Sequence, residues 1–348
     1  MTAAATPPHV PVVPPGPGAE RLRLLLSAAA RRNLLPALQE AVGPNLLDVL
    51  ALEDVAADEQ LTVHAAFISR DITGLSTKQT VLPDLAACYR VLRRSPALAW
   101  VHTHSAGSDR PIYGELMARG VAVTTSSGAN AQVVAHSALA AVLSLSRRFP
   151  QLMQAQQQRR WAPLVDGPLP PDLAGQTVAL VGWGPIARQL QPLLVALGLH
   201  VVVVRQQALP AGPGIQTLCF TELHRVLPRA HWLVLACPLN HQTRGLVDAR
   251  HLALLPAGAH VVNVARGEVV VQADLTAALQ SGQLGGAFLD VFDTEPLPPE
   301  SPLWALPGVM ITPHAAGHAA GNAARAAAIF VDNLARWCKG HALHNRVP

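Results

Sequence analysis

The chain has 348 residues, of which half are apolar and only 14% are charged, whereas about 25% are charged in an average globular protein. This composition supplies a large hydrophobic core and excludes a disordered chain or an acidic tail, and the length predicts two domains. The formal net charge of +4 comes from scattered arginines, and 4% of the residues are aromatic. Without a basic run or an aromatic stacking surface, we expect no nucleic-acid partner.

The cysteines and the first residues of the chain exclude further classes. The four cysteines lie far apart and form no C-x-x-C pair, which indicates neither a disulfide framework nor a metal site. Residues 1–20 are rich in Pro and Ala and lack the basic start of a signal peptide. Apolar runs such as 193–199 are shorter than the ~20 residues of a membrane span. We therefore expect a flexible extension followed by a cytoplasmic protein that does not associate with membranes.

The first half of the chain alternates short apolar runs with helix-length segments. In chain order, the expected strands are 21–27, 63–69, 98–102 and 121–125, and the expected helices are 28–42, a stretch around 113–119 and a long apolar helix over 130–148. This alternation predicts a parallel sheet covered by helices on both faces.

A second series of the same kind follows a Pro-rich loop at 163–171. Its expected strands are 178–182, 200–205, 232–237, 260–265, 286–292 and 309–313, and a last Ala-rich helix is expected over 317–339. The spacing of about 20–30 residues between strands leaves room for connecting helices. The sequence therefore predicts the α/β class, with two doubly wound parallel-sheet domains.

A glycine motif follows the first strand of the second series. In V-A-L-V-G-W-G-P-I-A (178–187), Gly182 and Gly184 occupy the first two positions of G-x-G-x-x-G/A, and Ala187 occupies the third. The first glycine permits a tight turn, the second lets the backbone approach a pyrophosphate, and the small third residue lets helix and strand pack closely. An ordinary glycine turn is the alternative, but the flanking strand and helix favour a dinucleotide site.

The end of the next strand bears on the choice of coenzyme. A carboxylate there binds the ribose hydroxyls of NAD, but this chain has Arg205 followed by two glutamines. Because an arginine pairs with a 2′-phosphate that an acid repels, we expect a preference for NADP over NAD. The alternative is a solvated surface arginine.

Three chemically complementary residues follow later strands. Arg266 lies in N-V-A-R-G-E, Glu295 in D-V-F-D-T-E-P and His314 in I-T-P-H-A-A-G. Hydride transfer to a ketone builds negative charge on oxygen, which a histidine neutralises by donating a proton near neutral pH. A carboxylate orients the imidazole and favours its charged form, and an arginine holds the oxygens of a keto acid. Taken singly, each residue has a structural alternative, as a surface arginine, a glutamate in a turn or a histidine after proline.

Together these motifs resemble the D-isomer-specific 2-hydroxyacid dehydrogenase family over about two-thirds of the chain. The resemblance also covers A-C-P-L-N-H-Q-T-R-G-L (236–246) and S-P-L-W (301–304). It implies that Arg266 binds the substrate, that Glu295 pairs with the catalytic histidine and that His314 is the acid–base. The amides of Ala106 and Gly107 would hold the substrate carboxylate, alongside Arg266 and His314. The implied coenzyme-binding residues, with Arg205 from the argument above, are Gly182, Gly184, Pro185, Ile186, Arg205, Cys237, Pro238, Thr243, Val264, Ala265, Asp290 and Gly317.

The resemblance further implies the domain organisation. A Rossmann-type NAD(P)-binding domain over 137–316 would be inserted into a flavodoxin-like substrate domain built from 1–136 and 317–348, and the protein would be a homodimer. The expected activity is hydride transfer between NAD(P)H and a small 2-keto acid, most simply glyoxylate or hydroxypyruvate. Two alternatives stay open, a 3-phosphoglycerate dehydrogenase using Arg70 and Arg110 for a phosphate, and a coenzyme-sensing protein of the co-repressor kind.

Several histidines depart from the family pattern. His136 stands where the family has Glu, and His231 replaces an Asp before the strand at 232. His102 and His104 are unusual so close to the substrate loop. Each has a structural alternative, such as a helix cap or a loop histidine, and together they leave the identity of the 2-hydroxy acid open.

Overall fold

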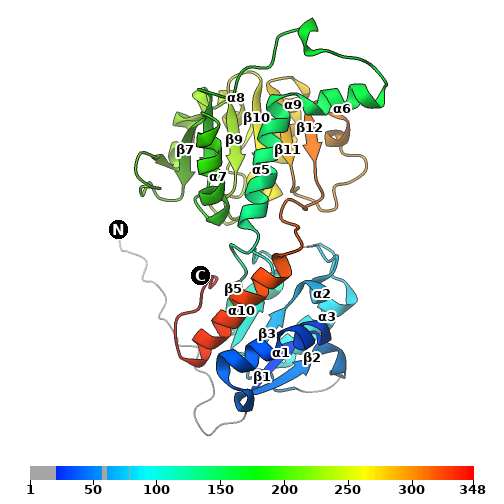
Figure 1. Cartoon of the computed structure of the whole chain (residues 1–348), viewed down its shortest axis with the longest axis vertical. Coiled ribbons are helices and arrows are strands. Elements are labelled where there is room, and N and C mark those ends of the chain that lie inside the picture. The colour runs from blue at the N-terminus through cyan, green and yellow to red at the C-terminus, as the bar shows by residue number, and fades with distance from the viewer. Residues whose placement is uncertain (1–20, 57–60, 78) are drawn as a thin grey trace. The chain divides into compact units, whose positions relative to one another are not determined.

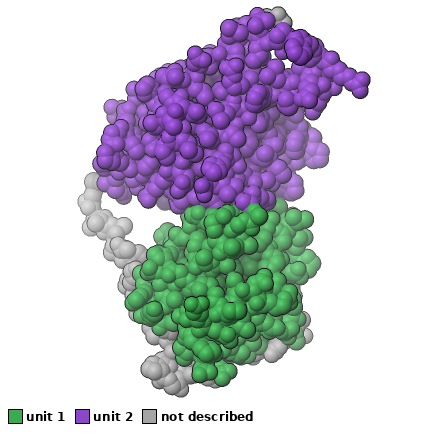
Figure 2. Space-filling view, in the orientation of Figure 1, with its two compact units in different colours: residues 1–129, 320–348 green, residues 130–319 purple. Residues whose placement is uncertain are grey.

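The computed structural model describes residues 21–56, 61–77 and 79–348, so the extension expected at 1–20 lies outside the described residues. The chain forms two compact units, one of residues 1–129 with 320–348 and one of residues 130–319, shown in different colours in Figure 2. The limits of these units differ by a few residues from the domain limits expected at 136/137 and 316/317, which stay a prediction. Helix α5 (Ala131–Ser146) explains the first difference, because Val134 and Ala135 already pack in the core of the second unit.

The first unit is built on a parallel sheet with the strand order β2-β1-β3-β4-β5, the order of flavodoxin-like folds. Its strands are β1 (Leu22–Leu26), β2 (Leu47–Ala51), β3 (Ala65–Ile68), β4 (Trp100–Thr103) and β5 (Ala122–Thr125). Its helices are α1 (Ala28–Val42), α2 (Arg70–Thr73), α3 (Pro83–Arg94), α4 (Pro111–Ala118) and α10 (Asn322–Cys338).

The last helix closes the core of the first unit. Phe330, Leu334 and Trp337 of α10 are buried against the strands, and the N-terminal helix α1 lies beside α10 (Figure 1). The residues after α10 then run along the edge strand β5, where the Val347 amide donates to the Val123 carbonyl. The final helix begins at Asn322 rather than at 317, because residues 315–319 belong to the loop of the second unit.

The second unit carries a parallel sheet with the order β12-β11-β10-β9-β6-β7-β8. Its strands are β6 (Thr177–Val181), β7 (His200–Arg205), β8 (Gln216–Cys219), β9 (Trp232–Leu235), β10 (Ala259–Asn263), β11 (Leu284–Leu289) and β12 (Val309–Ile311). Its helices are α5, α6 (Phe149–Gln157), α7 (Pro185–Ala196), α8 (Ala249–Leu254) and α9 (Gln272–Gln280). One apolar core covers each face. Because β6 has β7 on one side and β9 on the other, the chain reverses its direction of progress there, and ligands bind at such switch points.

Two strands of the structure were not predicted from the sequence. β2 and β8 are both edge strands, and they interrupt the expected series of strands. β2 contains Asp48, which pairs with Arg23, and β8 begins with the exposed Gln216. Edge strands are covered on one side only, so polar residues break the apolar run by which a buried parallel strand is recognised.

Candidate active site

The three complementary residues of the sequence lie in the loops after three neighbouring strands of the second unit. Arg266 follows β10, Glu295 follows β11 and His314 follows β12, and these strands pair in parallel in that order. Their carboxyl ends therefore meet at one edge of the sheet, where ligands bind in open α/β sheets.

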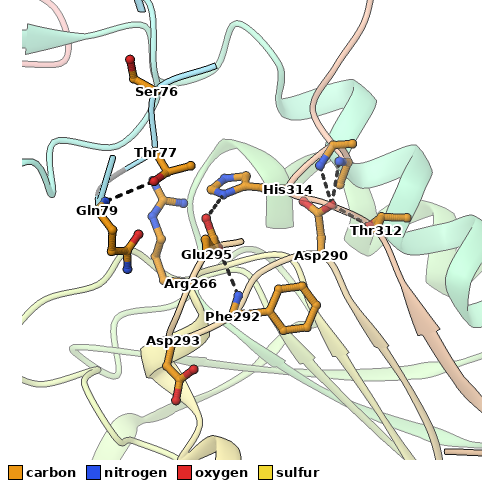
Figure 3. Close-up of polar contacts among 12 residues, drawn as sticks. Ser76, Thr77, Gln79, Arg266, Asp290, Phe292, Asp293, Glu295, Thr312 and His314 are labelled. Carbon is orange, nitrogen blue, oxygen red and sulfur yellow. Dashed lines mark hydrogen bonds and ion pairs between the residues drawn. The ribbon is translucent and has the colours of Figure 1, made fainter. Parts of the chain in front are cut away.

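His314 and Glu295 form a hydrogen-bonded pair. Nδ1 of His314 lies 2.9 Å from Oε2 of Glu295, and the two side chains point toward one another (Figure 3). The backbone amide of Phe292 donates to Oε1 of the same carboxylate at 3.0 Å. Glu295 is 13% exposed and His314 48% exposed, so a fixed carboxylate orients an accessible imidazole. That is the arrangement required of a general acid–base.

Asp290 shapes the loop that carries His314. Its Oδ1 accepts hydrogen bonds from Thr312 Oγ1 at 2.6 Å and from the amides of Ala315 and Ala316 at 2.7 and 2.9 Å. The amide of His314 donates to the Asp290 carbonyl at 2.8 Å, and His314 adopts a left-handed φ of 52°. Burial raises the pKa of Asp290, although these hydrogen bonds favour its charged form. The predicted contact of Asp290 with a nicotinamide carboxamide stays a prediction.

The turn that carries Arg266 is held by hydrogen bonds to Asn263 and by the close packing of Gly267. Asn263 accepts from the Ala265 amide at 3.0 Å and donates to the Arg266 carbonyl at 3.1 Å. A Cβ atom built on Gly267 would stand 1.8 Å from the carbonyl carbon of Phe292. The turn after β10 therefore lies directly against the backbone that leads to Glu295. Sequence reasoning gave no role to Asn263 or Gly267, although both flank Arg266 in the N-V-A-R-G motif.

The glycine motif forms a cradle at the switch point of this sheet. Gly182 has a φ of +105°, and a Cβ there would lie 2.6 Å from the Ala236 carbonyl oxygen. At Gly184 nothing lies within 4 Å of the Cβ position, and Ala187 is fully buried. Gly184 immediately precedes Pro185, the first residue of α7. The open space over a glycine at a helix N-terminus fits a pyrophosphate.

Other predicted coenzyme residues lie around this cradle. Arg205 is the last residue of β7 and lies opposite Cys219 in the neighbouring strand β8. Ile186 is half-buried in the first turn of α7. The side chains of Cys237, Val264 and Ala265 are buried in the two cores, so these residues present chiefly their backbone, whereas Pro238 is exposed.

Two residues of this group have structural roles. Thr243 is fully buried, and its hydroxyl donates to the Pro238 carbonyl at 2.7 Å. The side chain of Thr243 is thus enclosed and stabilises the turn at 238–243, and its coenzyme contact stays a prediction. Gly317 packs against α5, since a Cβ there would lie 2.5 Å from Nδ2 of Asn130. Its prediction as a coenzyme residue stays open.

In the first unit, the loop predicted to hold the substrate carboxylate follows β4. Ala106 is exposed and Gly107 half-buried, and Ser105 Oγ donates to the Gly107 carbonyl at 2.9 Å. Arg110 at the end of this loop donates to the carbonyls of Thr77 and Ser76 at 2.7 Å each. Its guanidinium therefore holds the neighbouring loop. The alternative in which Arg70, which is exposed, and Arg110 contact a phosphate stays a prediction.

The histidines that depart from the family pattern have diverse surroundings. Nδ1 of His231 accepts from the Thr177 amide at 3.2 Å, which ties β6 to β9. His136 is exposed on α5. His104 Nε2 lies 3.1 Å from Thr73 Oγ1, and His102 is fully buried in β4.

Residues 21–56, 61–77 and 79–348 contain no group of three or more His, Cys, Asp or Glu side chains arranged to bind a metal ion. None of their helices combines the length and the apolar character that a membrane crossing requires.

Comparisons with known proteins agree with this geometry. Residues 139–316, slightly more than half of the chain, match the model of the D-isomer specific 2-hydroxyacid dehydrogenase NAD binding domain. The glyoxylate/hydroxypyruvate reductase A of Salmonella paratyphi B is 38% identical over 182 residues, which are 51% of this chain and 56% of that protein. The chain thus aligns with little more than half the length of this relative.

Solved structures extend the similarity over nearly the whole chain. A D-isomer specific 2-hydroxyacid dehydrogenase from Xanthobacter autotrophicus Py2, in complex with NADPH and MES, has a TM-score of 0.73 at 30% identity and covers 94% of this chain and 98% of its own. An NADPH-dependent glyoxylate/hydroxypyruvate reductase from Sinorhizobium meliloti, in complex with NADP and malonate, has a TM-score of 0.70 at 27% identity, with 94% and 97% covered. The chain belongs to the D-isomer specific 2-hydroxyacid dehydrogenase family. The resemblance and the two-domain α/β fold predicted from the sequence are thereby confirmed.

Proposed function

We propose that the protein catalyses reversible hydride transfer between NAD(P)H and a small 2-keto acid, giving a D-2-hydroxy acid. The observation that carries this proposal is the pair of His314 and Glu295, whose Nδ1 and Oε2 atoms lie 2.9 Å apart in the loops after β12 and β11. Strand β11 pairs with β10, which leads to Arg266. Glyoxylate and hydroxypyruvate are the proposed substrates, since relatives at 38% and 27% identity bear the names of their reductases.

The chemistry assigns one task to each side chain. The nicotinamide, when bound, supplies the hydride to the keto carbon, and the carbonyl oxygen gains negative charge. Charged His314 donates its proton to that oxygen, while the Glu295 carboxylate stabilises the imidazolium. Arg266 binds the oxygens of the keto acid through its planar fork of donors. In the opposite direction neutral His314 accepts the hydroxyl proton, so the same residues serve oxidation.

The second unit is the proposed coenzyme domain, and the first unit carries the proposed carboxylate-binding amides of Ala106 and Gly107. The open cradle at Gly184 supports a pyrophosphate at the N-terminus of α7. Arg205 supports a 2′-phosphate and hence NADPH as the preferred coenzyme. Comparing kcat/KM for NADPH and NADH tests this choice, and a strong preference for NADH contradicts it.

The experiment that tests the reaction follows the absorbance of the reduced nicotinamide over a panel of 2-keto acids with each coenzyme. The panel includes glyoxylate, hydroxypyruvate and its 3-phosphate, and the configuration of each product is determined. We expect turnover of the small, unphosphorylated acids and loss of kcat by at least ~100-fold in His314→Ala, with the Kd of the coenzyme unchanged. Equal turnover in that variant contradicts the proposal, and preference for the 3-phosphate supports the phosphoglycerate alternative.

We also propose a homodimer built on α6 and the segment that follows it. The segment after α6 extends beyond the rest of its unit in Figure 1. Helix α6 and this segment expose Phe149, Met153 and Trp161, the last 93% exposed. Exposed apolar groups on a projecting segment are typical of an interface, and a second copy buries them symmetrically. Sedimentation of the wild type and of Trp161→Glu tests this. We expect the wild type to sediment as a dimer and the variant to shift toward monomer.

The cytoplasm is the proposed compartment, because a reductase depends on the NAD(P)H that cells regenerate there. Fractionation of cells that express the full chain tests this placement.

A further inference from the structure

The most buried polar side chain of β4 is the imidazole of His102. It is 0% exposed and lies among the rings of Phe67, Trp100 and Phe330, with centroid separations of 5.6, 6.2 and 5.7 Å. A buried imidazole is unfavourable unless both ring nitrogens are hydrogen-bonded. Here both are, because Nδ1 lies 2.7 Å from Thr124 Oγ1 and Nε2 lies 2.9 Å from Ser126 Oγ.

The other hydrogen bonds of Ser126 and Thr124 indicate which partner donates in each of their two contacts with His102. The Ser126 hydroxyl donates its single proton to the Thr103 carbonyl at 3.0 Å, so it can only accept from His102. The tautomer consistent with this donor carries the proton of His102 on Nε2. At the other end, Thr124 Oγ1 accepts from Nε1 of Trp100 at 2.8 Å, which leaves its proton for Nδ1 of His102.

The result is an ordered chain of donors that runs from Trp100 through Thr124, His102 and Ser126 to Thr103. A second proton on the imidazole would face the Thr124 hydroxyl proton inside an apolar core. Burial, with a smaller contribution from His104, lowers the pKa of His102 to about 3. Burial and the two hydrogen bonds therefore both favour a neutral imidazole in the physiological range.

The chain of hydrogen bonds ends at the loop after β4. The Ser126 amide donates to the carbonyls of Thr103 and Ser105 at 3.0 and 2.9 Å. Ser105 in turn donates through Oγ to the Gly107 carbonyl at 2.9 Å. The position of Ser126 is therefore transmitted to the backbone of Ala106 and Gly107, the amides proposed to hold the substrate carboxylate.

We propose that His102 is a positioning residue, which locks Ser126 and thereby the Ala106–Gly107 loop in the geometry that binds a carboxylate. The proposal rests on the proposed function and adds to it a residue remote from the reacting atoms. Since the imidazole does not reach the substrate, its loss affects substrate binding through loop order and leaves the coenzyme site of the second unit unchanged.

The first test uses the wild-type protein and needs no activity. With ¹⁵N-labelled histidine, and with His102→Asn to identify the signal, nuclear magnetic resonance reports the tautomer of His102. We expect a neutral ring protonated on Nε2 whose shifts do not change between about pH 5 and pH 8. A proton on Nδ1, or titration within that range, overturns the proposal.

The second test compares variants in the KM for glyoxylate, the kcat and the Kd for NADPH. His102→Asn removes the donor to Ser126, whereas the longer amide of His102→Gln retains a donor at the place of Nε2. We expect KM to rise about 10-fold in His102→Asn and less than about 3-fold in His102→Gln, with kcat within about 3-fold and Kd unchanged.

Ser126→Ala removes the receiving hydroxyl and should raise KM as His102→Asn does, with no further rise in the double variant. Ser146→Ala is its matched control, because Ser146 is also buried and donates to the Leu143 carbonyl, but within α5. If His102→Asn does not fold, the Ser126→Ala and Ser146→Ala pair decides. Equal KM values in these two variants overturn the proposal.

Amide hydrogen exchange of the 103–110 segment separates this proposal from the proposed function. We expect faster exchange there in His102→Asn and Ser126→Ala than in Ser146→Ala. A wild type that reduces no keto acid refutes the function, whereas unchanged exchange in both variants refutes the positioning role.

Discussion

Gly267 and Phe292 are in backbone contact, so that a Cβ atom on Gly267 would stand 1.8 Å from the carbonyl carbon of Phe292. This contact joins the turn that carries Arg266 to the loop that carries Glu295, because Phe292 donates its amide to the Glu295 carboxylate. The geometry of the site therefore requires a residue without a side chain at position 267, in addition to its functional groups.

Gly267→Ala should separate these two loops. Because the clash is with backbone, relief requires displacement of a loop, and we expect a loss of about 2–4 kcal/mol in the free energy of unfolding together with most of kcat. Gly114→Ala in α4 is the control, since nothing lies within 4 Å of that Cβ position, and alanine in a helix stabilises by about 0.5–1 kcal/mol. Urea unfolding measures both, and equal stabilities of the two variants contradict the prediction.

Gly184→Ala should affect the coenzyme and leave the fold intact. The φ of Gly184 is −84°, and its Cβ position is open, so alanine is accommodated without strain. The added methyl group occupies the space proposed for the pyrophosphate, and we expect the Kd for NADPH to rise at least about 10-fold while the stability changes by less than about 1 kcal/mol. Fluorescence titration with NADPH gives the Kd. Unchanged affinity in the folded variant would show that the cradle holds no phosphate.

Asp290→Ala should disorder the loop of His314. The substitution leaves the amides of Ala315 and Ala316 without their acceptor, and we expect a loss of about 2–3 kcal/mol in stability and at least a tenfold loss of kcat. Thr312→Val is the milder companion, because it removes only one of the three donors to Oδ1 and should cost about 1 kcal/mol. Thermal unfolding and steady-state kinetics measure the losses of stability and kcat in both variants. Losses in Thr312→Val equal to those in Asp290→Ala contradict the prediction.

His102 should make the stability depend on pH. Burial lowers the pKa of His102 from the usual 6.5 to about 3, so below pH 6.5 the unfolded chain binds a proton that the folded chain excludes. The contribution to stability is complete above the unfolded pKa and is lost as the pH falls toward the folded value. Between pH 7 and pH 5 we expect a loss of about 2 kcal/mol.

His102→Asn lacks this loss, so the difference in unfolding free energy between wild type and variant should shrink by that amount at pH 5. His260 has a pKa lowered to about 4 and cancels, because both proteins contain it. Urea unfolding at the two pH values makes the measurement. Parallel losses in the two proteins would show that His102 titrates as in water.

Local sequence patterns determined much of the fold and of the site. Buried parallel strands such as β6 and β10 appear as apolar runs because both faces are covered, and the helix over 28–42 coincides with α1, which begins at the Ser27 cap. Arg266, Glu295 and His314 were recognisable because each follows a short apolar run. The edge strands β2 and β8 were missed, since a half-covered strand tolerates the polar residues that hide its pattern.

Tertiary structure decided which of these groups act together. Glu295 and His314 meet only because β11 and β12 pair in parallel, and the turn of Gly267 reaches Phe292 only because β10 lies on the other side of β11. Likewise, nothing local shows that Thr243 is buried in its turn or that His102 is buried in its core. Burial and hydrogen-bond direction depend on neighbours distant in sequence, and those neighbours are set by strand order and packing.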